Sequence, residues 1–292
     1  MASKTAMSPI KTIGISIRPQ AARAKTLANE LATSLVAQGC DVLCDVTQAS
    51  KVHETASLQN MAKRVDLLIV LGGDGTLLHA ARHFMNSNVP ILGINLGRLG
   101  FLTDTPVGSM FDVVESVLAG HYKTKHHFGL HASCWRDGQC LKEDIAMNDV
   151  VLQRYAHPRP IEFEVIYGDQ SMFRLHADGV VLATPAGSTA YALSAGGPIV
   201  HPEVEAISVV PLCPHTLSNR PVLIPANEII TLQLLSSPNP SVLNLDGQES
   251  FILSEGDEVK VKKAGDVSLI YLPERHYFNT LRSKLHWAGY ED

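Results

Sequence analysis

Aromatic side chains are scarce in this chain, at 6% of its 292 residues. Positive charge is scarce as well, because 24 Lys and Arg face 29 Asp and Glu and leave a net charge of −5. This balance argues against a nucleic-acid polymer or a membrane surface as the partner, since both require concentrated positive charge. A local cleft lined by basic residues is still compatible with this net charge.

Long apolar segments and cysteine pairs are also missing. The longest aliphatic run, at 67–71, is far below the roughly 20 residues that cross a bilayer. The N-terminus lacks the apolar stretch of a secretory signal. The odd number of cysteines, without a CxxC pair, predicts reduced, buried thiols in a cytoplasmic protein. The five are Cys40, Cys44, Cys134, Cys140 and Cys213.

The remaining composition is that of a soluble globular protein, with 45% hydrophobic and 18% charged residues. A chain of this length predicts about two domains. Glycine and proline are plentiful, at 21 and 16 residues. We therefore expect backbone turns to matter more for function than aromatic platforms.

The first part of the chain alternates between strand-like and helix-like segments. The aliphatic run at 66–71 is typical of a strand buried in a parallel sheet, and Leu27, Leu31 and Leu35 recur at helical spacing. The alternation predicts a doubly wound, Rossmann-like α/β domain. The expected strands are 13–17, 42–46, 66–71 and 90–95, and the expected helices are 21–38, 76–86 and 109–119.

The pattern changes after about residue 125 to short strand-like runs separated by Pro, Gly, Asn and Asp. This pattern predicts an all-β domain, a β-sandwich. The expected strands are 162–167, 179–183, 229–235, 242–245, 259–261 and 267–272. The segment 275–288 looks helical again and is expected to pack on the first domain. The predicted organisation is an α/β domain over 1–125, a β-rich domain over 126–273 and a helical segment over 274–292.

The first candidate site is the sequence LGGDGTLLHAARHF at 71–84, a strand, a glycine turn and a helix start. Its glycines permit positive φ and close approach of a ligand, and the helix N-terminus suits phosphate. A carboxylate beside phosphate is unfavourable unless it binds a cation or accepts a proton, so Asp74 is a candidate general base or Mg²⁺ contact. The alternative is that Asp74 or Thr76 only caps the helix. Leu78 stands where the third glycine of a GxGxxG fingerprint would be, and GxxxxGK[ST] is absent.

Three further segments carry candidate binding groups. The sequence GINLGRLGFLTD, at 93–104, follows a predicted strand at the sheet edge where ligands bind. The loop 178–202 combines small residues with hydroxyls and suits a flat ligand lying close to the backbone. Asn148 and Asp149 offer an amide and a carboxylate for an adenine edge or a ribose diol. Ordinary turn and loop chemistry is the alternative for each, and it alone explains the turn before Gln248.

Taken together and in this order, these segments resemble the NAD kinase family. The GGDGT turn alone is shared with phosphofructokinases and lipid kinases, whereas its combination with the TPxGSTAY loop is more specific. The resemblance spans most of the chain from residue 66 onward. The matching segments are 72–76, 95–101, 148–149, 184–198, 213–221 and 277–281.

The resemblance implies phosphorylation of the 2′-hydroxyl of the adenosine ribose of NAD by ATP, which gives NADP. It also implies a divalent metal cation, usually Mg²⁺, a cytoplasmic homodimer or homotetramer, and Asp74 as the proton acceptor. Arg159 would offer charge to a phosphate. The residues implied to bind NAD are Asp74, Gly75, His79, Asn148, Asp149, Arg159, His176, Asp178, Thr189, Ala190, Tyr191, Ala192, Leu193, Ser194 and Gln248.

Three other functions are compatible with parts of the sequence. A lipid kinase would share the glycine turn, but the chain has no basic amphipathic stretch. A dinucleotide sensor without catalysis would keep the loops yet would not need Asp74. A dehydrogenase would need the complete GxGxxG fingerprint and would not explain the β-rich second half.

Overall fold

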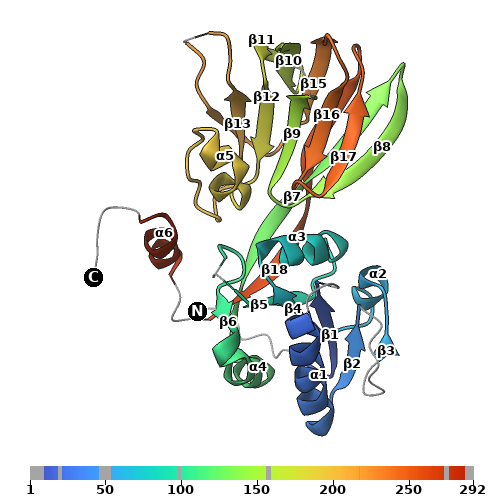
Figure 1. Cartoon of the computed structure of the whole chain (residues 1–292), viewed down its shortest axis with the longest axis vertical. Coiled ribbons are helices and arrows are strands. Elements are labelled where there is room, and N and C mark those ends of the chain that lie inside the picture. The colour runs from blue at the N-terminus through green and yellow to red at the C-terminus, as the bar shows by residue number, and fades with distance from the viewer. Residues whose placement is uncertain are drawn as a thin grey trace. The chain divides into compact units, whose positions relative to one another are not determined.

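The computed structural model describes residues 10–18, 22–45, 54–97, 100–155, 159–216, 218–272 and 276–286. Predictions that fall on Ala21, Val46, Leu99, Leu217 and residues 275, 287 and 288 lie outside these ranges. The chain divides into two compact units (Figure 1). Unit 1 comprises Met1–His126 and Val267–Asp292, and unit 2 comprises His127–Asp266.

Unit 1 is built around a parallel sheet whose order is β18, β5, β4, β1, β2, β3 (Figure 1). Its strands are β1 (Thr12–Ile17), β2 (Asp41–Cys44), β3 (Glu54–Thr55), β4 (Leu67–Gly72), β5 (Pro90–Asn95), which also pairs with β6 (Thr105–Pro106), and the end of β18 (Glu258–Tyr271). From β1 the chain goes first to β2 on one side and then to β4 on the other. The carboxyl ends of β1, β2, β4 and β5 therefore share one edge.

Helices cover both faces of this sheet because successive strand residues point to opposite sides. Ile13 and Ile15 pack in one cluster with α1 (Ala22–Ala37) and α4 (Met110–Leu118). On the opposite face the small Gly14 lies against Met61 of α2 (Leu58–Met61), and Gly93 lies against Leu77 of α3 (Asp74–His83). A short 3₁₀ turn, η1 (Val107–Ser109), precedes α4, and α6 (Tyr277–Leu285) follows β18. The predicted α/β domain and C-terminal helix are confirmed.

Unit 2 consists of two sheets. One has the order β14 (Val222–Pro225), β13 (Ala206–Leu212), β12 (Gly179–Ala183), β9 (Asp149–Arg154), β16 (Ser241–Leu245), β17 (Glu249–Leu253). The other contains β11 (Gln170–Ala177), β10 (Ile161–Tyr167), β15 (Ile230–Ser236), part of β18, β7 (Lys123–Arg136) and β8 (Gln139–Ala146). Val150 and Leu152 of the first sheet share a core with Phe163 and Leu232 of the second. The predicted β-rich domain is confirmed.

The outer face of the six-stranded sheet carries a smaller apolar cluster. Val151, Val181 and Val210 pack there against Ala192 of the short helix α5 (Tyr191–Ser194). A 3₁₀ turn, η2 (Gly187–Thr189), leads into this helix. The loop that the sequence singled out is thus anchored on a sheet face by an alanine.

Several details of the sequence prediction are wrong. The expected strands 259–261 and 267–272 are one strand, β18, whose partly exposed polar middle at 262–266 looked like a break. Helix α3 begins at Asp74 and not at residue 76, because Gly73 takes the N-cap position. No strand was predicted at β3, β6, β7, β8, β9, β11, β13, β14 or β17.

The five cysteines are free thiols, but only Cys44 and Cys134 are buried, whereas Cys140 and Cys213 are exposed. The expectation of uniformly buried thiols is therefore wrong. Of the helices within the described ranges, none has the length and apolar character needed to cross a membrane.

Candidate functional site

The glycine turn of unit 1 joins β4 to α3 at the carboxyl edge of the parallel sheet. Gly73 is the N-cap and makes no side-chain cap hydrogen bond. A Cβ on Gly73 or Gly75 would meet nothing within 4 Å, so this end of α3 has space for a ligand. A helix N-terminus with this room around it is suited to binding phosphate.

The glycines of the turn allow close packing around the backbone and do not adopt an unusual backbone conformation. Gly72, Gly73 and Gly75 are not among the residues with positive φ, so the turn does not use the positive φ that glycine permits. A Cβ on Gly72 would lie 2.4 Å from Oγ1 of Thr76. Glycine is needed there because the strand end and the first helical turn meet too closely for a side chain.

The carboxylate of Asp74 is held by the loop that follows β5. Its Oδ2 accepts a hydrogen bond from the N–H of Phe101 at 2.8 Å. Its Oδ1 accepts from the N–H of Leu102 at 3.2 Å and from both the N–H and the Oγ1 hydroxyl of Thr103 at 2.8 Å. Of the two oxygens, Oδ2 therefore has more remaining capacity to accept a further hydrogen bond.

Two other residues, Asn95 and Gly100, allow this loop to bind the carboxylate of Asp74. Asn95, at the end of β5, donates to the carbonyl and the hydroxyl of Thr103 at 3.2 and 2.8 Å and accepts from the N–H of Gly97 at 2.8 Å. A Cβ on Gly100 would lie 1.8 Å from Oδ1 of Asp74. Glycine is therefore needed at position 100, because a side chain there would occupy the space of the Asp74 carboxylate.

The donor set around Asp74 determines which metal the site fits. Across the described ranges no group of three or more His, Cys, Asp or Glu is placed to hold a metal ion. Asp104 and Asp74 both act on Tyr271, whose pKa is raised by burial first and then by these two charges. One or two carboxylates suit Mg²⁺ when substrate phosphates supply further oxygens.

The first cavity of unit 2 has a volume of about 580 Å³ and lies on the outer face of the six-stranded sheet. Asn148, Asp149 and Asp246 contribute its polar wall. The carboxylate of Asp246 accepts hydrogen bonds from the N–H groups of Met147, Asn148 and Asp149 at 2.8, 2.7 and 3.1 Å. Asp246 can adopt this position because it and Gly247 have positive φ, the geometry of a tight hairpin turn.

Two groups of this cavity are poised to meet a ligand. The Oδ1 atom of Asn148 is buried and has no hydrogen-bond partner in the described structure. Burial, and then the nearby charge of Asp246, raise the pKa of Asp149 to about 7. A buried polar atom without a partner is costly, so a ligand that donates to Asn148 would relieve that cost.

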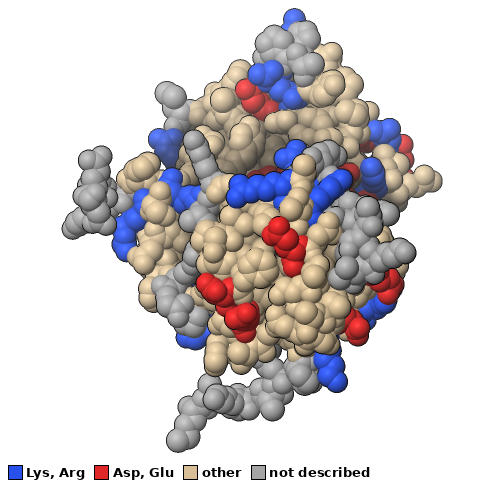
Figure 2. All heavy atoms as spheres, turned by 60° about the horizontal axis from the view of Figure 1, so that its bottom comes forward, with Lys and Arg blue, Asp and Glu red and all other residues tan. Residues whose placement is uncertain are grey.

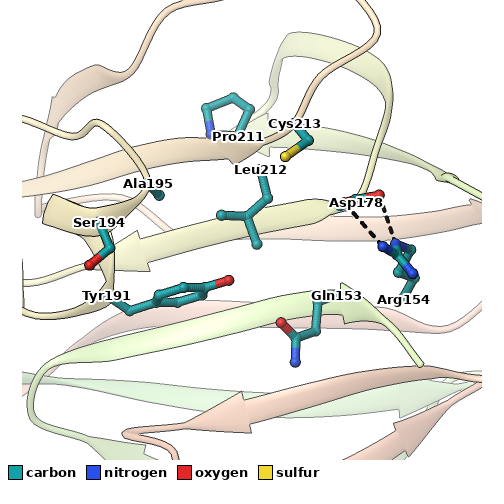
Figure 3. Close-up of a pocket in the computed structure, with 9 residues that line it drawn as sticks. All are labelled: Gln153, Arg154, Asp178, Tyr191, Ser194, Ala195, Pro211, Leu212 and Cys213. Carbon is teal, nitrogen blue, oxygen red and sulfur yellow. Dashed lines mark hydrogen bonds and ion pairs between the residues drawn. The ribbon is translucent and has the colours of Figure 1, made fainter. Parts of the chain in front are cut away.

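A second cavity of about 500 Å³ adjoins the first, and the two share Gln153 and Tyr191 (Figure 3). Opposite Tyr191, the Nε of Arg154 donates to Oδ1 of Asp178 at 2.7 Å and an Nη donates to Oδ2 at 3.3 Å. Cys213 and Ser194 also line this cavity. Two adjoining cavities, each of ordinary ligand-binding size, match the two halves of a dinucleotide.

The structure brings some of the sequence-predicted residues together and not others. Asn148, Asp149, Ala190, Tyr191, Asp178 and Ser194 line the two cavities. Ala192 is the buried residue of α5 and packs on the sheet, and Thr189, Leu193 and Gln248 are not among the lining residues.

Five predicted residues lie elsewhere. His176 is exposed on β11, 3.4 Å from Glu162, and Arg159 is exposed just before β10. Asp74 and Gly75 are in unit 1 at the glycine turn. His79 is in unit 1 too and lines a separate cavity beside Asp45.

Sequence reasoning missed Arg154, Gln153 and Asn244 as cavity residues. All three lie on β9 or β16. Gln153 and Arg154 follow three consecutive apolar residues in the run VVLQR, so this run carries no alternation from which their place in a cavity could be predicted. Arg154 could only be linked to Asp178 once the pairing of β9 with β12 was known.

An α/β unit with a phosphate-binding turn and a β-sandwich with a two-part cavity define a two-domain nucleotide-binding protein. Comparison with known proteins specifies it further. The family model described as the ATP-NAD kinase N-terminal domain matches residues 13–122, and that of the ATP-NAD kinase C-terminal domain matches residues 147–270. The chain belongs to the NAD kinase family of enzymes.

Individual relatives agree with this assignment. The NAD kinase of Saccharophagus degradans is 40% identical over 97% of this chain and 99% of its own length. That of Magnetococcus marinus is 44% identical over 82% of this chain and 79% of its own. A crystal structure of yeast NADH kinase complexed with NADH has a TM-score of 0.87 at 30% identity and covers 98% of this chain and 90% of that one. An NAD kinase from Archaeoglobus fulgidus in complex with ATP shares the fold, with a TM-score of 0.72 at 21% identity.

Proposed function

We propose that this enzyme transfers the γ-phosphate of ATP to the 2′-hydroxyl of the adenosine ribose of NAD and forms NADP and ADP. The observation that carries the proposal is that the chain has both a carboxylate at the open N-terminus of α3 in unit 1 and a two-part cavity of dinucleotide size in unit 2. Phosphoryl transfer depends mainly on positioning and charge neutralisation. Both functions can be assigned to residues of this chain.

Asp74 is the proton acceptor in this proposal. The loop donors at 101–103 fix its carboxylate, and Oδ2 keeps capacity to accept the hydrogen bond of a ribose hydroxyl. As phosphoryl transfer forms the new P–O bond, the hydroxyl proton passes to this oxygen. The N-terminus of α3, with Gly73 and Gly75 open around it, binds phosphate.

A divalent cation, Mg²⁺, neutralises charge on the donor phosphates when it is bound. Asp74 is the residue of this chain that we assign to contact it, with the phosphates supplying other oxygens. On the face drawn in Figure 2, Lys and Arg side chains gather in a band with acidic groups on either side of it. Local positive charge of this kind is compatible with nucleotide binding by a protein whose net charge is −5.

NAD binds in unit 2 in this proposal. Asn148 and Asp149 contact one nucleoside and Asp178 the other, with Ala190, Tyr191 and Ser194 between them. Thr189, Ala192, Leu193 and Gln248 shape the loop and turn around the ligand. The resemblance also assigns Gly75 of the glycine turn to NAD, whereas the exposed Arg159 and His176 lie outside both cavities and receive no contact in this proposal. By family resemblance, the enzyme acts in the cytoplasm as a homodimer or homotetramer.

The experiment that tests the proposal is incubation of the purified chain with NAD, ATP and Mg²⁺. The product is detected with a dehydrogenase that accepts only NADP. We expect NADP to accumulate in proportion to enzyme and to ADP formed. Binding of NAD without NADP formation would instead favour a dinucleotide sensor.

A further inference from the structure

Unit 1 contains a third cavity, separate from the glycine turn, that the proposed mechanism does not use. Its volume is about 330 Å³, and its lining comprises Ile17, Asp45, Ser57, Leu58, Gln59, His79 and His83. Ile17 ends β1, Asp45 follows the last residue of β2, and the two histidines lie on α3. The cavity is therefore at the same carboxyl edge of the sheet as the glycine turn.

The topology of the sheet identifies this position as a preferred ligand site. The strand β1 pairs with β2 on one side and with β4 on the other, so the chain reverses its direction of winding at β1. The helices that follow β1 and β4 pack on opposite faces. In open α/β sheets, ligands bind outside the carboxyl ends of the strands at such a switch point.

Asp45 supplies the recognition chemistry. It is anchored by the hydroxyl of Ser16 and by the N–H of Ile17, which donates to Oδ1 at 3.2 Å. Burial raises its pKa, while these hydrogen bonds and the charge of His79 act in the opposite direction. An acidic residue at the end of a strand, held with its carboxylate toward a crevice, is the group that typically accepts hydrogen bonds from a ribose diol.

The distance to the glycine turn fits a nucleoside triphosphate. His79 is five residues beyond Asp74 on the same helix, which corresponds to about 7.5 Å along its axis. A ligand whose sugar lies at Asp45 can therefore extend its phosphates along α3 to the helix N-terminus. The imidazoles of His79 and His83, with ring centroids 5.4 Å apart, form the wall of the cavity on the side of α3, and His79 is the nearer of the two to the helix N-terminus.

We propose that the cavity of Asp45, His79 and Ser57 binds the ribose of the phosphate donor, and that Asp45 accepts hydrogen bonds from its 2′- and 3′-hydroxyls. This inference rests on the proposed function, because it takes ATP as the donor. The sequence analysis assigned His79 to NAD, whereas this inference assigns His79 to the donor. It also makes Asp45 a residue that selects ribonucleotide donors.

The test compares ATP with 2′,3′-dideoxy-ATP as donors for the full chain and for Asp45→Asn. A hydrogen bond to a charged group contributes enough binding energy that we expect about a tenfold higher KM for the dideoxy donor with the unaltered enzyme. Asp45→Asn should raise the KM for ATP by about tenfold and abolish the discrimination, with the KM for NAD unchanged. Asp41→Asn, the same substitution at the exposed opposite end of β2, is the control and should behave as the unaltered enzyme.

Calorimetric binding of a non-hydrolysable ATP analogue gives a readout that does not depend on turnover. Asp45→Asn and His79→Ala should both weaken it, and NAD binding should stay the same and report an intact fold. Unchanged ATP binding and unchanged discrimination in Asp45→Asn would overturn the inference, as would a loss of NAD affinity alone in His79→Ala. If the unaltered enzyme binds the analogue but forms no NADP, the proposed function fails while the binding test of Asp45 still decides this inference.

Discussion

Oδ1 of Asp74 lies 1.8 Å from the point that a Cβ on residue 100 would occupy, so the carboxylate and Gly100 share one space. The side chain of Asp74 is seated by a loop 26 residues further along the chain. Any side chain at position 100 must displace either the carboxylate or the N–H groups of 101–103 that bind it.

This contact predicts that Gly100→Ala lowers kcat for NADP formation by about 100-fold, because a catalytic group displaced by about 1 Å loses reactivity on that scale. The measurement is steady-state kinetics with saturating NAD and ATP. Gly108→Ala is the matched control, since a Cβ there meets nothing within 4 Å. A wild-type kcat in Gly100→Ala would show that the hydrogen bonds from residues 101–103 to Asp74 do not matter for turnover.

The raised pKa of Asp149 predicts a pH-dependent stability. Its pKa of about 7 in the folded protein is above its ordinary value of 3.8, so the folded state favours the protonated carboxyl. The stability from this group is fully present below about pH 4 and is lost as the pH rises through 7. Asp149→Asn does not titrate at this position. The Tm of this variant relative to that of the wild type should therefore rise by roughly 3 °C or more between pH 5 and pH 8.

Thermal unfolding without nucleotide, in buffers from pH 5 to 8, measures this difference. Asp169→Asn, in an exposed hairpin turn, serves as the control and should follow the wild type across the range. A Tm difference for Asp149→Asn that stays constant with pH would show that the carboxyl is not held protonated.

The ion pair of Arg154 and Asp178 predicts that loss of the guanidinium weakens the binding of NAD. Both side chains line the second cavity and are about one-third exposed. Arg154→Met keeps much of the apolar stem and removes the guanidinium that orients Asp178. We expect the KM for NAD to rise about tenfold with little change in kcat, and Arg64→Met, at an exposed ion pair of unit 1, to change neither. Equal loss of kcat and kcat/KM would assign Arg154 to the transition state instead.

The sequence was sufficient for the parts of this protein that depend on local patterns. Strand 90–95 and strand 179–183 were predicted to the residue because their apolar runs end at turn residues. The seat of Asp74 by residues 101–103, the bridge from Arg154 to Asp178 and the cavity at Asp45 were not predictable, because each joins segments that only the sheet pairing brings together. Strand β18 was divided in two because its polar middle carries no apolar signal.

The pair of Arg136 and Asp257 predicts a large effect on stability. Asp257 is fully buried, and Arg136 donates to both of its oxygens at 2.7 and 2.8 Å. Although burial raises the pKa of Asp257, hydrogen bonds from Arg136 and Ser254 outweigh it and the pKa is lowered. The stability from this pair is therefore present at neutral pH and lost as the pH falls below the ordinary value of 3.8.

Arg136→Met leaves the buried carboxylate of Asp257 without its partner and should lower the free energy of unfolding at pH 7 in urea titrations. Arg174→Met breaks an exposed ion pair with Glu162 and should have a much smaller effect on the free energy of unfolding. Equal effects of the two substitutions would refute the distinction between an ion pair with a fully buried carboxylate and an exposed ion pair.

The role of Asp74 is tested most directly by NADP formation in Asp74→Asn, assayed with NAD, ATP and Mg²⁺. Asp112→Asn is the matched control, because Asp112 is likewise an acidic residue in the first turn of a helix, α4, and is exposed. Removal of a general base costs roughly 10²–10⁴-fold. We predict a loss of kcat of at least about 100-fold in Asp74→Asn with NAD still bound, and none in Asp112→Asn; kcat near the wild-type value in Asp74→Asn would contradict the account.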